Sequence, residues 1–514
     1  MCIVCGPGGS RFIQSIAGRY ALGRADTRAR FVAEEIAPAI TPPLDPADLE
    51  DLKGPADVIL RGGPILTSRG KGDAAQAVAV RAGRIQAVGD EATVLAFRGR
   101  LTRTIELDGR ALLPGFVIAD WHPPLSLLCD WLEDDQTTAT TLAASIAERS
   151  GEWLVLRMDG SSEDRSKAPL VTAASRPAVI LDRAGLAFAA SAAADALAPE
   201  LGLARLYATP PQGLPHVSSL LPALLERLTV SRDPMRARLR ALLGDAARGG
   251  VTALRFCGLG ALAGSDDPDM LRSAVGDSPP IRLRGVVDAD LALQSVGTPL
   301  APGVGDDMFR LDTATRWIDG GNADARELAG TVMALRNRGW RVTLHASDSD
   351  AVDLALDAFS TAASAATLLN AADGVERRGP LEAGSWARLR RLGLSTGLVI
   401  DEGIVPGGAA ADLDETGDVP VSSSLDRMAG LSGPLQMLSG AATIAGRAGV
   451  DDWLWSVTHG SATRCGAGDI LGSLDVGKYA DFAFLSDDPR HADSRDVSRL
   501  RCVGAWVAGR EIHP

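Results

Sequence analysis

Apolar strands and amphipathic helical segments alternate through the middle of the chain. Helical runs such as AVDLALDAFSTAASAATLL follow short strand-like runs, and this order predicts parallel strand pairing. So many units close most naturally as a (β/α)8 TIM barrel, with chemistry at the carboxyl ends of the strands. An open doubly wound sheet is the alternative, but no G-x-G-x-x-G follows an early strand to favour it. The strand-like runs are rich in Val and Leu and cover 153–158, 177–182, 251–256, 281–287, 341–345, 395–401 and 419–425.

The two ends of the chain share a different pattern. Short β-rich runs separated by glycine-containing turns occupy 56–113, and a matching group, including GSLDVGKYADFAFLSDDP, occupies 466–514. Such runs are typical of hairpins. We therefore expect a small β-sandwich domain assembled from both ends, around an α/β middle.

These patterns predict four parts of the chain. Residues 1–55 form an N-terminal helical arm, and residues 56–113 and 466–514 form the two parts of the β-sandwich. The (β/α)8 barrel covers 114–465. The stretch that follows its first strand is too long for one barrel connection, so we expect an inserted subdomain at about 125–245.

Composition narrows the classes of function. Hydrophobic residues make up 46% of the chain and charged residues 23%, as in a globular protein, while a formal charge of −13 argues against nucleic acid or an anionic membrane as partner. No apolar run is long enough to span a bilayer, and the start lacks the order of a signal peptide. We expect a cytoplasmic protein with a small-molecule substrate. Exposed edges of the terminal sheet are compatible with a homodimer.

One buried strand ends in an Asp-x-His pair. The run LPGFVIADWH places Asp120 and His122 two residues apart, so that both side chains point to the same side of the strand. The run is similar to the first barrel strand of the amidohydrolase superfamily, which usually reads PGFxDxHxH. Asp120 then stands where the first metal-binding histidine is expected.

Two further segments resemble the amidohydrolase-3 branch of that superfamily. GWRVTLHASDSDAVDLALDAF is similar to its fifth-strand segment and places His345 on a metal-ligand histidine. VPVSSSLDRMAGLSGPLQML is similar to the eighth-strand segment and places Asp426 on the aspartate that binds metal and takes a proton from the attacking water. With the terminal GSLDVGKYADFAFLSDDP, the resemblance covers most of 56–514 and implies the barrel with its composite sandwich.

Other positions of the branch are changed. The lysine that bridges two metals becomes Thr315, and the sixth-strand histidine becomes Arg377 in Val375–Glu376–Arg377. In the inserted region Leu186 stands at another histidine position. Without the bridging lysine, the resemblance implies one metal ion rather than two.

The implied site holds one divalent ion, Zn²⁺ or Fe²⁺. Its ligands would be Asp120, His122, His345 and Asp426, two imidazoles and two carboxylates. The ion would activate a water for hydrolysis of a C–N bond of an amide-type substrate, with Asp426 as base and then acid. Arg377 would hold a substrate carboxylate, offset the charge of Asp120, or fill the place of a second metal.

Two other hypotheses remain. The chain could be a catalytically inactive relative that serves as a binding or assembly scaffold, in which case we expect Arg377 to pair with Asp120 or Asp426. The N-terminal C-x-x-C, Cys2 and Cys5, could carry metal or redox chemistry, although the sequence has no second C-x-x-C.

Overall fold

The computed structural model describes most of the barrel and the terminal sheet. The described residues are 50–121, 132–133, 143, 153–157, 169–181, 187–197, 199, 232–259, 271–272, 280–294, 300–318, 324–346, 348–365, 367–377, 380–400, 419–425, 450–491 and 499–512. The predicted arm up to residue 49, with Cys2 and Cys5, lies outside them. They form two compact units, one within 124–239 and one made of residues up to 121 together with those from 240 onward. Among the described helices, none combines the length and apolarity that a bilayer span requires.

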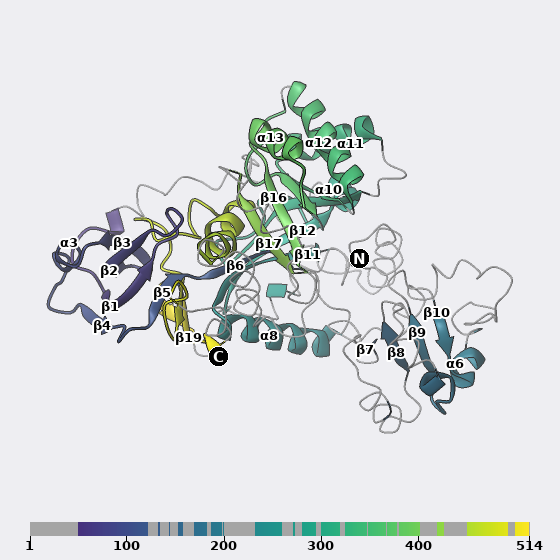
Figure 1. Ribbon diagram of the computed structural model, residues 1–514, viewed down its shortest axis with the longest axis horizontal. Helices are drawn as coiled ribbons and strands as arrows, with labels where there is room; N and C mark the ends of the chain where they lie inside the picture. Colours follow the sequence, from purple (N-terminus) through teal and green to yellow (C-terminus); the bar gives the residue numbers. More distant parts are fainter. Residues whose placement is uncertain are drawn as a thin grey trace, which may run out of the picture. The chain divides into compact units, whose positions relative to one another are not determined.

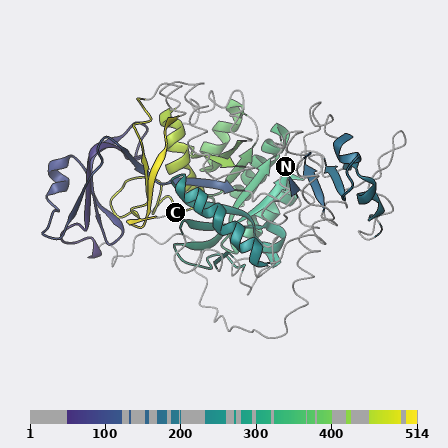
Figure 2. The ribbon, with the colours of Figure 1, turned by 90° about the horizontal axis from the view of Figure 1, so that it is seen from below.

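Strands from both ends of the chain join in one sheet of eight strands. In Figures 1 and 2 the yellow C-terminal strands lie beside the purple and blue N-terminal ones, in the order β20-β19-β18-β5-β1-β2-β3 with β4 paired to β1. This confirms the composite terminal domain. The strands are β1 (Val58–Leu66), β2 (Ala74–Arg81), β3 (Arg84–Gly89), β4 (Arg103–Glu106), β5 (Ala111–Pro114), β18 (Phe482–Leu485), β19 (Cys502–Val507) and β20 (Arg510–Glu511), with one short helix, α3 (Glu91–Leu95).

The sheet branches along β1. The first half of β1 pairs with β4 and its far end with β5, and the register shifts between Arg61 and Ile65. Gly63 lies at this shift, where a Cβ would come within 2.4 Å of the carbonyl oxygen of Arg110. Only glycine allows the backbones to approach so closely there. An apolar core that includes Phe482, Phe484 and Trp506 fills the domain.

Eight parallel strands close into a barrel (Figure 1). This closure confirms the TIM barrel and rejects the open doubly wound sheet. The barrel order is β6 (Phe116–Trp121), β11 (Val251–Leu259), β12 (Arg282–Asp288), β13 (Phe309–Ile318), β14 (Arg341–Ala346), β15 (Gly374–Arg377), β16 (Ser395–Ile400) and β17 (Val421–Leu425), which pairs back to β6.

Helices connect and flank the barrel strands. Asp324 and Asp348 cap α11 and α12, each accepting a hydrogen bond from a backbone N–H of the first turn. Leu328, Val332 and Leu335 form the buried face of α11. The helices of this unit are α8 (Arg232–Arg248), which begins before residue 240, then α10 (Ala289–Gln294), α11 (Ala325–Asn337), α12 (Ser349–Ser364), α13 (Ala383–Leu392), the π-helix η4 (Ser456–Gly460) and α16 (Ser461–Arg464).

The other unit holds a sheet of four strands and a short helix. Ser191 connects its parts: its hydroxyl donates to the carbonyl of Arg176 and accepts from the amide of Ala194, at the start of the helix. The sheet order is β10-β9-β8-β7. The elements are β7 (Leu132–Glu133), β8 (Leu154–Arg157), β9 (Ala178–Leu181), β10 (Ala187–Ala190) and α6 (Ala192–Ala196). The predicted strands at 153–158 and 177–182 belong to this sheet rather than to the barrel.

Candidate metal centre in the barrel

Strand register brings three side chains together near the carboxyl ends of β13, β14 and β15. Trp317 pairs with His345, and His345 pairs with Glu376. Register partners on neighbouring parallel strands share one face of a sheet, so the three side chains lie on the same face of the barrel wall. The His345 ring stacks on Trp317, with ring centroids 4.7 Å apart and planes 19° from parallel. The indole therefore fixes the orientation of the imidazole.

His345 and Glu376 form a close buried pair. Nδ1 of His345 lies 2.6 Å from Oε2 of Glu376, and both side chains are about 1% exposed. Asp120 on β6 completes a cluster in which one ligand atom from each residue lies within 4.8 Å of the others. One imidazole and two carboxylates in a buried position are donors that fit a divalent transition metal.

Asp120 also lies between two buried arginines. Its Oδ1 accepts from Nε of Arg255 at 2.8 Å and also from the Nη2 of that residue, while its Oδ2 accepts from Nε of Arg464 at 3.1 Å. Arg255 further donates to the carbonyl of Arg464 and to the Thr343 hydroxyl. All three charged side chains are fully buried. The two arginines thus compensate the negative charge of Asp120.

Arg377 lies on the other face of the barrel wall. It is the strand neighbour of Glu376, so its side chain points away from His345. Its guanidinium lies 5.6 Å from the ring centroid of Trp386 on α13, and its Nε donates to the Thr396 hydroxyl at 3.3 Å. Among the described residues of the predicted site, the structure therefore does not place Arg377 beside His345. The guanidinium groups on Asp120 come from Arg255 and Arg464, so the expected pairing of Arg377 with Asp120 is corrected.

Thr315 takes part in the barrel wall. Its hydroxyl donates to the carbonyl of Thr343 on the neighbouring strand at 3.1 Å, and the side chain is buried. The residue at the position of the bridging lysine thus has a structural hydrogen bond of its own.

His122 and Asp426 lie outside the described residues, as does Leu186. The structure does describe the residues that precede His122 and Asp426. These are Trp121, which ends β6, and Leu425, which ends β17, and they are register partners. The placement of His122 and Asp426 as ligands remains a prediction.

Sequence reasoning missed Glu376, Arg255 and Cys257. In the motif Val375–Glu376–Arg377, sequence reasoning selected Arg377 because it stands at the position of the family histidine. The strand register instead pairs His345 with Glu376. An arginine within the apolar run of β11 was the available signal for Arg255. The Sγ of Cys257 lies 3.5 Å from Oδ1 of Asp120, and burial, followed by the charges of Asp120 and Glu376, raises the pKa of this thiol. Cys257 therefore stays protonated and unreactive at neutral pH.

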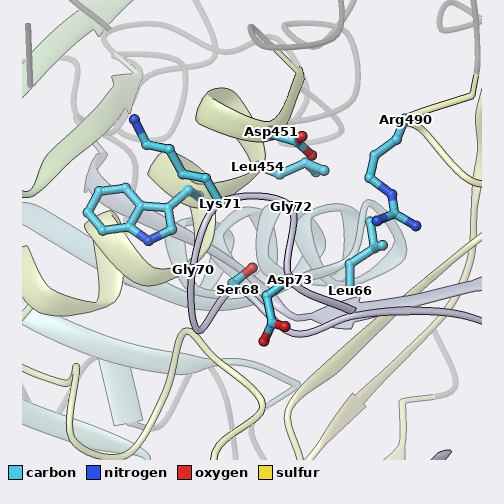
Figure 3. A pocket seen from close by; sticks show the side chains of 10 residues that line it. Leu66, Ser68, Gly70, Lys71, Gly72, Asp73, Asp451, Leu454 and Arg490 are labelled. Atoms are coloured by element: carbon cyan, nitrogen blue, oxygen red, sulfur yellow. The ribbon is translucent and has the colours of Figure 1, made fainter. Parts of the chain in front are cut away.

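A small cavity lies on the side of the terminal sheet (Figure 3). Its lining includes Ser68, Lys71, Asp451 and Arg490, from the β1–β2 loop, the helical segment 450–455 and the residues after β18. Its volume of about 20 Å³ suits about one water molecule. This cavity is too small for an organic substrate.

Comparison with known proteins identifies the family and similar folds. The profile of the amidohydrolase family matches residues 103–513, whereas no curated protein sequence matches the chain. A solved structure of an uncharacterized metal-dependent hydrolase from Pyrococcus horikoshii OT3 is 17% identical with a TM-score of 0.61, covering 85% of this chain and 99% of its own.

Two zinc-containing structures are also similar. The atrazine chlorohydrolase TrzN from Arthrobacter aurescens TC1 is 14% identical with a TM-score of 0.55, covering 88% of this chain and 94% of its own. An adenosine deaminase from Xanthomonas campestris is 14% identical with a TM-score of 0.53, covering 89% and 93%. At these identities the structures establish the fold alone. The family match spans most of the sequence, and the chain belongs to the amidohydrolase family.

Proposed function

We propose that this chain is a metal-dependent hydrolase that cleaves a C–N bond of a small amide-type molecule, with one divalent ion in the barrel. The observation that carries the proposal is the buried cluster of Asp120, His345 and Glu376, whose ligand atoms lie within 4.8 Å of one another. Its position near the carboxyl ends of the strands is where barrel enzymes place their chemistry. Membership of the amidohydrolase family supports the class of reaction.

His345 and Glu376 are the proposed main ligands. Glu376 could serve the ion in either of two ways, as a ligand or as the carboxylate that holds Nδ1 of His345 so that Nε2 binds the ion. Asp120 is proposed as a further ligand, with a carboxylate that also binds Arg255 and Arg464. His122 and Asp426 complete the proposed set. The donors suit Zn²⁺ or Fe²⁺.

When bound, the ion lowers the pKa of its water and polarises the substrate carbonyl. Asp426 is proposed to accept the proton of the attacking water and to return it to the leaving nitrogen. Trp317 holds the His345 ring in place and excludes water from one of its faces. Arg255 and Arg464 fix the position of the Asp120 carboxylate.

Metal analysis of the purified chain tests the proposal. We expect about one Zn or Fe per wild-type chain, lost in His345→Ala and reduced in Glu376→Gln. His491→Ala is the matched control, because His491 is exposed and pairs with Asp488, and it should keep the metal. A chain with metal should then hydrolyse a member of an amide library, with a rate that falls when the ion is chelated. Full metal content in His345→Ala would refute the assignment of the site.

A second candidate function is a binding scaffold without catalysis. The observation that favours it is the Arg255–Asp120–Arg464 group, which balances the charge at the first-strand position without any metal. A folded wild-type chain that takes up no Zn or Fe after supplementation would select this candidate.

A further inference from the structure

A buried arginine at the amino ends of the barrel strands makes no hydrogen bond to the described part of the chain. Arg284, the third residue of β12, is 1% exposed. Its Nε and Nη2 atoms are fully buried and find no acceptor among the described residues. Burial lowers the pKa of Arg284, but a guanidinium stays protonated in proteins. A buried cation requires a compensating negative charge.

The buried carboxylates at this end of the barrel bind other arginines. Asp312 accepts from Nη1 of Arg341 at 2.6 Å and from the Thr313 hydroxyl at 2.9 Å. Asp481 accepts from Arg282 on both oxygens, at 2.8 and 3.1 Å. The charge of Asp312 lies near enough to favour the charged form of Arg284, but among the described residues neither carboxylate accepts a hydrogen bond from Arg284.

The strand neighbours of Arg284 add positive charge. Arg255 on β11 and Arg310 on β13 are both its register partners. Arg255 forms an ion pair with Asp120. Among the described residues, the arginines around Arg284 outnumber the carboxylates that bind them at this end of the barrel.

The segment after α16 packs under this end of the barrel. Gly466, with φ of +62°, lies so close to Arg341 that a Cβ would come within 1.7 Å of the guanidinium. Cys465 joins Val117, Ala119 and Ala253 of the barrel wall in an apolar cluster. Such a covered place suits a single small ion better than an organic anion.

We propose that the Arg284 guanidinium binds a halide ion, chloride under ordinary conditions, at the amino ends of the barrel strands. The ion accepts hydrogen bonds from the buried N–H groups of Arg284 and supplies the missing negative charge. This site is separate from the proposed metal centre and does not depend on it.

Thermal unfolding of the full chain in different salts tests the proposal. In buffers of equal ionic strength, chloride and bromide should raise the unfolding midpoint of the wild type by a few °C over gluconate, in a saturable manner. Arg284→Gln should lose this response, and in gluconate it should be at least as stable as the wild type, because it removes an uncompensated charge. Arg388→Gln is the control: Arg388 pairs with Asp353 and Asp357 on the helix layer, and this variant should keep the response.

A strong destabilisation of Arg284→Gln in every salt, with no halide response in the wild type, would overturn the proposal by showing that a carboxylate of the chain is the partner. If the variant does not fold, anomalous diffraction from wild-type crystals grown in bromide decides the question. We expect a bromide peak at Arg284. An ordered water there, with adventitious ions only at the surface, would also overturn the proposal.

Discussion

The two halves of the barrel interior differ in the charged groups that the described residues place there. Near the carboxyl ends, Glu376 stands beside the His345 imidazole, and the nearby arginines are bound to Asp120. Near the amino ends, Arg284 stands among other arginines whose carboxylate partners are taken. We propose the first arrangement as a cation site and the second as an anion site. The same barrel thus holds two proposed sites of opposite charge, and Arg255, which binds Asp120, is a register partner of Arg284.

Removing the charge of Asp120 should have the largest effect. Asp120→Asn leaves two buried arginines without their partner, so we expect a loss of about 3–5 kcal/mol in the free energy of unfolding. Chemical denaturation measures the loss. Asp353→Asn, which removes an exposed partner of Arg388, should change stability little. A loss in Asp120→Asn no larger than in this control would show that the arginines do not depend on Asp120.

A side chain at Gly466 should disturb the amino-terminal half of the barrel. Gly466→Ala places a methyl group against the Arg341 guanidinium in a left-handed backbone conformation, which we expect to cost about 1–3 kcal/mol. Gly384→Ala in α13 is the matched control, because a Cβ there meets nothing within 4 Å. The control should be neutral or slightly stabilising. Equal stability of the two variants would contradict the described packing under the barrel.

Glu376→Gln should weaken the binding of the divalent ion at the carboxyl ends of the strands. The variant keeps the shape of the side chain but removes its charge, and we expect the affinity for the divalent ion to fall about 10- to 100-fold. Competition with a chromophoric chelator measures the affinity. Arg377→Gln should leave it unchanged, since Arg377 lies against Trp386 on the outer face. A larger loss in Arg377→Gln than in Glu376→Gln would restore the original prediction for Arg377.

The last expected effect is a dependence of stability on alkaline pH, which is small near pH 9 and grows above it. Burial, more than any other cause, raises the pKa of Cys465 from an ordinary value of 9.0 to about 12. The unfolded chain therefore loses this proton from about pH 9, and the folded chain keeps it until about pH 12. Folding stability should fall across that interval, because the unfolded state binds fewer protons there. Cys465→Ala should show a shallower fall in denaturation experiments. An identical slope would show that this thiol does not contribute.

The sequence pattern was sufficient for the architecture but only partly so for the site. Alternating strands and helices predicted the closed barrel, and the β-rich ends predicted their common sheet, because both follow from local periodicity. The resemblance selected His345 and Asp120, which the structure does bring together. Glu376 could not be selected without the register between β14 and β15. Arg464 reaches Asp120 from 344 positions away, and a contact at that separation depends on the closed fold.

Anomalous diffraction from one crystal grown with zinc and bromide tests the division of the barrel most directly. Data at the two absorption edges locate both ions in the same molecule. The account predicts zinc at His345 and Glu376 and bromide at Arg284. Zinc absent from the barrel, or bound without His345, would contradict the cation site, and a halide found only outside the barrel would contradict the anion site.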